Sequence, residues 1–278
     1  MLDFAPDRPP TVPRPAATTL VIRPGSCTIE ILGILRHPRS SFLGGVLAFP
    51  GGKVDTQDRE ECWASYGSPV HGERLDAPES PRTLAVTACR ELLEEAAILP
   101  APGLSHDRAV LLQQQIRQGV SFAKVVASLE VSLNLGNLHT FGRWVTPEAE
   151  ARRYDATFFL MVLPEGQEGH SDQHETTAAL WDSPAGFLER WARGELQMAP
   201  PTTRMLELLS GCVSVKEALA LAARQRLQAV CPRFVADESG GFLALPGDPA
   251  HEIQERRVDG PTRFVLREGR FVSTDPYG

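Results

Sequence analysis

Residues 85–98 read AVTACRELLEEAAI, and this order of charged and apolar side chains predicts an amphipathic helix. At about 100° per residue, Glu91, Glu94 and Glu95 fall within one arc of roughly 100°. The apolar residues on the opposite side anchor the helix to a core; they are Ala85, Cys89, Leu92, Leu93 and Ala96. Carboxylates four residues apart repel each other by roughly a few tenths of a kcal/mol, and a bound cation removes this repulsion. Carboxylate oxygens suit Mg²⁺ or Mn²⁺.

A solvated acidic face is the common explanation for such a charge cluster. Two features favour a binding site instead. The acids lie in the C-terminal half of the expected helix, where the helix dipole disfavours negative charge. They are also preceded by Phe49-Pro50-Gly51-Gly52, a strand end followed by a glycine turn whose backbone can come close to a ligand.

Together these residues resemble the Nudix family, whose signature reads G-x5-E-x7-R-E-U-x-E-E-x-G-U, where U is aliphatic. Gly52 matches the opening glycine, and the residues from Arg90 to Glu95 and Ile98 match the second half position by position. Asp58 stands where the first Glu is expected, and Ala97 replaces the late glycine. A further departure is that 31 residues, rather than 7, separate Asp58 from Arg90.

This long insertion makes the chain similar to the animal peroxisomal coenzyme A diphosphatases and their bacterial relatives. The resemblance runs from about Ser41 to Leu209 and includes the segments 41–58, 90–96, 139–147 and 152–155, Glu175 with Trp181, and the turn at 199–202. It implies an α/β (α+β) fold, namely a Nudix-type α/β/α sandwich with a mixed sheet, and suggests a homodimer. The implied activity is metal-dependent cleavage of a diphosphate linkage in a nucleotide-linked metabolite.

The substrate is left open by the sequence. Ser41 stands where another branch of coenzyme A hydrolases has an Arg, so coenzyme A or acyl-CoA competes with ADP-ribose, NADH and dinucleoside polyphosphates. Asp58 and Ala97 also keep a non-catalytic Nudix-fold nucleotide-binding regulator as an alternative. The intact acids from Glu91 to Glu95 favour the enzyme.

The resemblance implies a role for each residue of the signature. Glu91, Glu94, Glu95 and the Gly51 carbonyl are expected to bind Mg²⁺ or Mn²⁺, and Arg90 to orient a carboxylate of the signature. The general base is expected to be Glu94 or Glu95, or else the distant Glu175, for which a solvated loop position is the alternative. Candidate substrate-binding residues are Gly52, Arg36, Arg152 and Arg153, since guanidinium groups pair with phosphate oxygens. A strand cap is the alternative role for Arg152 and Arg153.

The composition and net charge of the chain limit the classes of molecule that it is expected to bind. The 278 residues are 42% hydrophobic and 23% charged, as in ordinary globular proteins. A net charge of −7 argues against non-specific binding to nucleic acid or anionic membranes, so we expect a small-molecule nucleoside-diphosphate substrate. Five scattered cysteines without a CxxC pair favour a reducing compartment. With no apolar run of roughly 18–20 residues, we expect a cytoplasmic protein.

The pattern of turns and apolar runs predicts three regions. We expect a flexible Pro-rich arm at 1–17, a Nudix domain at 18–210 with insertions at about 53–79 and 101–139, and a helix and hairpin extension at 211–278. The 53–79 insertion lacks a sustained period and is expected on the surface. Strands are predicted at 18–23, 28–35, 46–49, 141–145 and 157–163, and hairpins at 233–245 and 262–272. Helices are predicted at 80–98, 105–118, 121–133, 184–193, 202–209 and 213–228.

Overall fold

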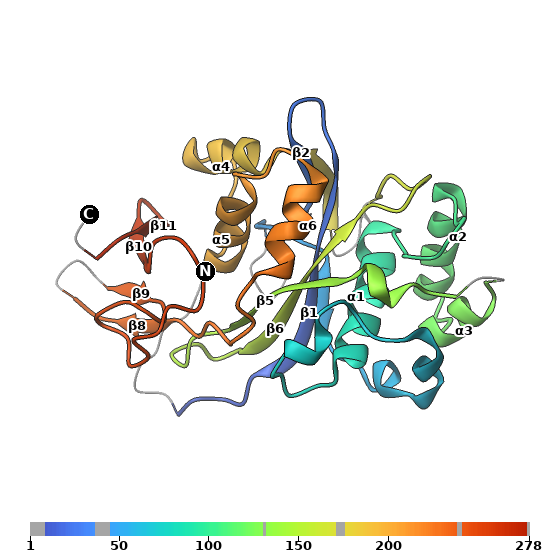
Figure 1. Ribbon diagram of the computed structural model, residues 1–278, viewed down its shortest axis with the longest axis horizontal. Helices are drawn as coiled ribbons and strands as arrows, with labels where there is room; N and C mark the ends of the chain where they lie inside the picture. Colours follow the sequence, from blue (N-terminus) through green and yellow to red (C-terminus); the bar gives the residue numbers. More distant parts are fainter. Residues whose placement is uncertain (1–8, 37–44, 130–131, 171–175, 238–240, 277–278) are drawn as a thin grey trace.

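The structure is a computed structural model that describes residues 9–36, 45–129, 132–170, 176–237 and 241–276. Within these residues a seven-stranded sheet has the order β3-β2-β1-β6-β5, with β4 paired to β1 and β7 paired to β2 (Figure 1). Its strands are β1 (Arg14–Pro24), β2 (Ile29–Arg36), β3 (Leu47–Ala48), β4 (Gly51–Lys53), β5 (His139–Val145), β6 (Tyr154–Val162) and β7 (Thr176–Asp182). Strands β1 and β6 are parallel and the other pairs are antiparallel, so the sheet is mixed, as predicted.

Both faces of the central strands are buried, which explains their nearly continuous apolar sequences. Along β1, Val21 belongs to one apolar core, whereas Leu20 and Ile22 belong to the other. Strand β6 alternates in the same way, with Phe159 in the first core and Phe158 in the second. The period of two along each strand therefore divides the apolar side chains between two layers of helices.

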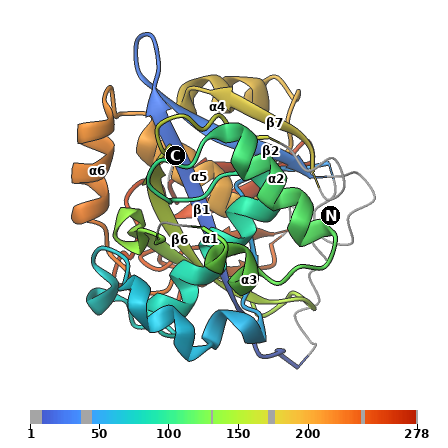
Figure 2. The same ribbon diagram turned by 90° about the vertical axis from the view of Figure 1, so that its right-hand side faces the viewer.

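The first core lies under α1 (Pro81–Ala96), α2 (His106–Arg117) and α3 (Phe122–Ala127), which Figure 2 shows in front of the sheet. The second core lies under α4 (Pro184–Ala192), α5 (Pro200–Leu209) and α6 (Val215–Ala223). The resulting α/β/α sandwich confirms the predicted fold class. None of the helices in the described part of the chain is long and apolar enough to cross a membrane.

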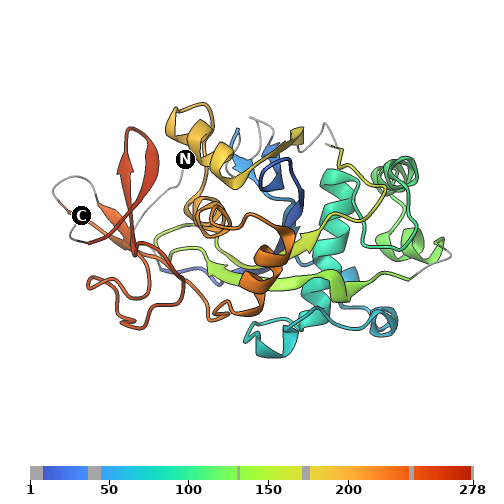
Figure 3. The same ribbon diagram turned by 45° about the horizontal axis from the view of Figure 1, so that its top comes forward.

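The two C-terminal hairpins join into one four-stranded sheet, at the end of the molecule away from α1–α3 (Figure 3). Strands β8 (Arg233–Val235) and β9 (Phe242–Ala244) form one hairpin, and β10 (Arg263–Arg267) and β11 (Arg270–Thr274) form the other. Pairing between β9 and β10 connects the hairpins. Arg204 of α5 is fully buried beneath this sheet, where it donates to the Asp259 and Pro261 carbonyls at 2.8 and 2.6 Å.

Three predicted boundaries are wrong. Strand β1 begins at Arg14, inside the expected Pro-rich arm. Pro15 lies at the start of β1, a position at which strands tolerate proline, and its carbonyl accepts from the Val54 amide beyond the end of β4. The helix predicted at 121–133 ends at Ala127, and that predicted at 213–228 ends at Ala223.

The insertion at 53–79 is also more deeply packed than predicted. It forms three short 3₁₀ helices, η1 (Thr56–Arg59), η2 (Glu61–Tyr66) and η3 (Gly72–Arg74). Trp63 of η2 is only 1% exposed, and its ring stacks on Phe122 of α3 with centroids 5.3 Å apart. Its indole N–H donates to the Gln57 carbonyl at 2.8 Å. The insertion thus shares the core under α1, although its sequence has no helical or strand period.

Candidate active site

Helix α1 carries the acidic stripe, and its two ends follow from local sequence. Ser80 is the N-cap, because its hydroxyl accepts from the Thr83 amide at 3.0 Å, and Pro81 occupies the first turn. At the other end Ala97 has φ 51° and ψ 41°, the left-handed conformation in which helices often end on glycine. The late glycine of the signature is therefore a helix-ending position, and here an alanine occupies it.

The two glycines that the sequence placed in a turn belong to β4, and they meet the acidic stripe directly. The Gly51 amide donates to Glu95 Oε2 at 2.9 Å. A Cβ on Gly52 would lie 2.4 Å from Glu91 Oε1, and a Cβ on Gly51 would lie 2.5 Å from the Ala17 carbonyl oxygen. Glycine is needed at both positions because the neighbouring strand and the carboxylate of α1 occupy the space of a side chain.

Arg90 is held by Asp58, across the long insertion. Its Nε donates to Asp58 Oδ1 and its Nη2 to Asp58 Oδ2, both at 2.9 Å. Asp58 Oδ2 also accepts from Thr87 Oγ1 and the Asp55 amide, each at 2.9 Å. The Asp58 side chain is fully buried. Asp58 is thus the carboxylate that holds Arg90 from across the insertion. The signature alone predicted only that Arg90 pairs with one of its carboxylates.

The remaining nitrogen of Arg90 ties two acids of the stripe together. Nη1 donates to Glu91 Oε1 at 2.8 Å and to Glu94 Oε2 at 3.0 Å. Burial alone would lower the pKa of Arg90, but Asp58, Glu91 and Glu94 outweigh it and raise the pKa above its usual value. Arg90 therefore stays charged and fixes the spacing of the carboxylates around it.

Glu94 is the acid of the stripe whose pKa lies well above the usual value of a glutamate. Burial raises its pKa to about 7, against the opposing charge of Arg90 and with a further increase from Glu91. A carboxyl group that titrates near neutral pH suits proton transfer. The environment of α1 therefore separates Glu94 chemically from an ordinary surface glutamate.

The donor set of the stripe fits a divalent cation. Three carboxylates and a close glycine backbone offer the oxygen ligands that Mg²⁺ and Mn²⁺ prefer. Among the described residues, no three His, Cys, Asp or Glu side chains are already gathered as a complete ion cage. The Arg90 guanidinium and the Gly51 amide donate to these carboxylates and so hold the stripe together.

The other candidate residues lie in different surroundings. Arg153 is buried, and its guanidinium donates to the Thr11 and Thr146 carbonyls at 2.7 and 3.0 Å, which matches the strand-cap role. Arg152 is exposed next to it. Arg36 is the last residue of β2, with its backbone opposite Thr176. Glu175 lies outside the described residues.

Comparison with known proteins places this architecture in a family. Residues 69–209 match the family model of the NUDT19 Nudix domain. The chain is 25% identical over 312 residues to acyl-coenzyme A diphosphatase NUDT19 of Homo sapiens, covering 92% of this chain and 83% of that protein. It is 27% identical over 302 residues to the Gallus gallus protein of the same name, covering 89% and 79%. A NUDIX hydrolase from Alicyclobacillus acidocaldarius matches with a TM-score of 0.65 and 31% identity, over 76% of this chain and 96% of that one. The chain therefore belongs to the NUDT19 Nudix domain family and is a Nudix hydrolase, as its signature predicted.

Proposed function

We propose that this Nudix hydrolase cleaves the diphosphate linkage of coenzyme A or an acyl-CoA, with Mg²⁺ or Mn²⁺ as cofactor. The observation that carries the reaction class is the contact of Glu91 and Glu95 with Gly51 and Gly52 of β4, beside the buried Arg90–Asp58 pair. The substrate is supported by the relatives from Homo sapiens and Gallus gallus, which are acyl-coenzyme A diphosphatases by name.

Glu91, Glu94, Glu95 and the Gly51 carbonyl are the groups that we assign to metal binding. A divalent ion held there supplies positive charge to the diphosphate and makes water more acidic. The stripe can provide this binding because Arg90 and Gly51 already hold its carboxylates at one end of α1.

Side chains of the protein position the metal ligands and accept the proton. Asp58 fixes Arg90, and Arg90 orients Glu91 and Glu94 through one nitrogen. Glu94, with a pKa of about 7, is our first candidate to accept the proton from the attacking water. Glu95 and Glu175 are the alternatives for this role. Glu95 is tied to the Gly51 amide, which favours a ligand role for it.

For the substrate we assign Gly52, Arg36 and Arg152. Gly52 presents backbone without a side chain next to Glu91, so a diphosphate can approach closely. Arg36 and Arg152 offer guanidinium groups for phosphate oxygens. Arg153 is used instead to hold the chain before β6.

The test is hydrolysis by the purified protein and by Glu94→Gln and Glu95→Gln variants, with Mg²⁺ or Mn²⁺. Each variant should lose at least about 100-fold in kcat, because a metal ligand or the base is removed. Glu73→Gln is the matched control, since Glu73 lies in the insertion and its side chain is 74% exposed. If both signature variants keep an activity within a factor of about 3 of that of the unchanged protein, the proposed metal site on α1 is wrong.

The substrate is tested with a panel of coenzyme A, an acyl-CoA, ADP-ribose, NADH and diadenosine polyphosphates, with product identification. Release of 3′,5′-ADP from coenzyme A or acyl-CoA at the highest kcat/KM supports the proposal. A higher kcat/KM for ADP-ribose, NADH or a dinucleoside polyphosphate would replace the substrate while leaving the reaction class intact.

We also propose a cytoplasmic homodimer that binds neither nucleic acid nor membranes. The net charge of −7 supports this choice of partners, because both surfaces repel an acidic protein. Sedimentation at micromolar concentration tests the oligomeric state, and a monomer would contradict it.

A further inference from the structure

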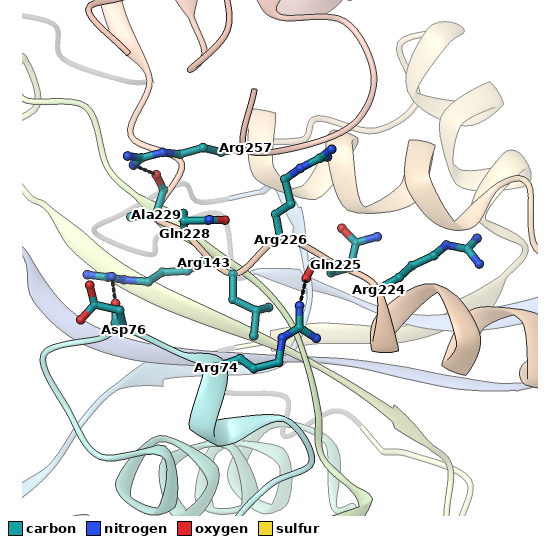
Figure 4. A pocket seen from close by; sticks show the side chains of 10 residues that line it. Arg74, Asp76, Arg143, Arg224, Gln225, Arg226, Gln228, Ala229 and Arg257 are labelled. Carbon is teal, nitrogen blue, oxygen red and sulfur yellow. Dashed lines mark hydrogen bonds between the residues drawn. The ribbon is translucent and has the colours of Figure 1, made fainter. Parts of the chain in front are cut away.

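A basic pocket lies apart from the acidic stripe, at the opposite edge of the sheet. Five of the described residues that line it are arginines: Arg74, Arg143, Arg224, Arg226 and Arg257. We call it the arginine pocket (Figure 4). It encloses about 630 Å³, within the range of small-molecule sites. It forms where η3, β5, the segment after α6 and the C-terminal extension meet.

Two of these guanidinium groups are fixed by contacts within the protein. Arg74 donates to the Ala223 and Gln225 carbonyls at 2.9 and 2.8 Å. Arg143 pairs with both oxygens of Asp155 at 2.7 and 2.6 Å and also donates to the Asp76 carbonyl. These contacts hold the positive charges in place before any ligand arrives, which reduces the entropy lost on binding.

The other three arginines retain donors for which the described residues provide no acceptor. Arg257 donates through Nη1 to the Ala229 carbonyl at 2.7 Å, yet its buried Nε has no partner among the described residues. The guanidinium of the exposed Arg224 makes no hydrogen bond or ion pair with any residue that the structure describes. Arg226 has a single exposed partner, Asp259. A buried donor without an acceptor is costly, so the pocket is better suited to an anion than to water alone.

The charge of the pocket contrasts with that of the whole chain. The described lining carries five guanidinium groups and the carboxylate of Asp76. Asp155 and Asp259 add two more carboxylates as partners of Arg143 and Arg226, so the pocket is still positive. The chain as a whole has a net charge of −7. A local positive concentration in an acidic protein attracts anions by electrostatic focusing.

The arginine pocket is separate from the acidic stripe. Arg143 pairs with Thr157, Thr157 with Ala17, and Ala17 with Gly52, so all four lie in one row across the sheet. Three strand spacings of about 4.8 Å put the backbone of Arg143 about 14 Å from that of Gly52. Thr157 and Ala17 are buried between them, so no open path runs along the row.

The lining indicates the class of ligand. None of the described lining residues is aromatic, so the lining offers no aromatic ring for a nucleobase. Arginines, by contrast, offer forked donors that match phosphate oxygens. We propose that the arginine pocket binds a compact, phosphate-rich anion, of which inorganic tripolyphosphate is the simplest probe, at a site distinct from the acidic stripe.

The experiment is calorimetric titration of the full-length, metal-free protein with tripolyphosphate in EDTA and 0.15 M NaCl. Binding should be submillimolar, and Arg224→Ala combined with Arg226→Ala should weaken it at least 10-fold. Both side chains are exposed, so the fold should survive, and circular dichroism checks this. The matched control combines Arg117→Ala with Arg193→Ala, two exposed arginines outside the pocket that remove the same charge. This pair should change the affinity less than 2-fold.

Three outcomes would overturn the proposal: no binding at 5 mM, equal weakening by the control pair, or equally tight binding of an oligoglutamate peptide. A combined Glu94→Gln and Glu95→Gln variant should bind tripolyphosphate normally. A clear gain in affinity there would place the ligand beside the acidic stripe instead, because the variant removes two negative charges that repel an anion. Because neither metal nor turnover is involved, the result is independent of whether the proposed hydrolysis is correct.

Discussion

The Asp58 carboxylate accepts two hydrogen bonds of 2.9 Å from the Arg90 guanidinium, although 31 residues separate the two in sequence where the signature has 7. Asp58 lies within η1 and makes a reciprocal contact with Asp55, which caps the start of that helix, and Arg90 is buried on α1. The residues inserted between Asp58 and Arg90 therefore do not disturb the contact between the two side chains.

Asp58→Asn should destabilise the protein by about 3 kcal/mol, because it leaves the charge of Arg90 in a buried site with a weaker partner. We do not expect a larger loss, because Arg90 keeps its hydrogen bonds to Glu91 and Glu94. Urea denaturation at pH 7 measures the change, with Glu73→Gln as the exposed control. A loss below about 0.5 kcal/mol would contradict a structural role for the pair.

Ala97 is both left-handed and fully buried. Ala97→Gly relieves about 1 kcal/mol of backbone strain and loses about 0.8 kcal/mol of methyl burial, so stability should change by less than about 0.5 kcal/mol. Ala97→Val should cost more than about 2 kcal/mol, since a β-branched residue is strained here and overpacks the core. Thermal unfolding of the two variants checks the contrast, and equal effects would argue against left-handed strain.

Metal affinity should fall as the pH falls through 7. Glu94 binds a proton below its pKa of about 7 in the metal-free protein, and the proton competes with the metal for the same carboxylate. The Mn²⁺ affinity should therefore be constant above pH 8 and should drop about tenfold per unit below pH 7. Calorimetry at pH 6 and pH 8 measures this difference. In Glu94→Gln it should shrink to less than about 2-fold, and an unchanged difference would assign the titration to another group.

Arg204 fastens the C-terminal sheet to α5. Its guanidinium donates hydrogen bonds to Asp259, Pro261, Ser273 and Glu207. The same group lies 5.2 Å from the centre of the Phe264 ring. Arg204→Met should cost about 2–4 kcal/mol, because two buried carbonyl groups lose their donor. Limited proteolysis should then cut the extension first. Arg233→Ala, in the same sheet with a half-exposed side chain, should leave the cleavage pattern unchanged.

Much of the fold could be predicted because its signals are local. Ser80-Pro81 marked the start of α1, and the apolar runs marked β1 and β6. In the site, the spacing of the acids from Glu91 to Glu95 indicated the shared face, which depends only on helical geometry. The same local signals set the approximate extents of α2, α4 and α5.

The rest depends on contacts between distant segments. Trp63 is buried because α3 lies against it, and no periodic pattern around residue 63 reports that contact. Arg153 could not be assigned from sequence, since its acceptors are carbonyls of Thr11 and Thr146 on other segments. The arginine pocket was missed for the same reason: its arginines come from four separate stretches of an acidic chain.

The stacking of Trp63 on Phe122 joins the insertion at 53–79 to the insertion at 101–139, and the Phe122 amide donates to Gln57 Oε1 at 3.3 Å. Each insertion therefore supplies part of the other's apolar surroundings. A chimaera that transplants only one of them onto a shorter Nudix scaffold would expose an indole or a phenyl ring to water. The two segments are best treated as a single cassette, to be exchanged or deleted as a pair.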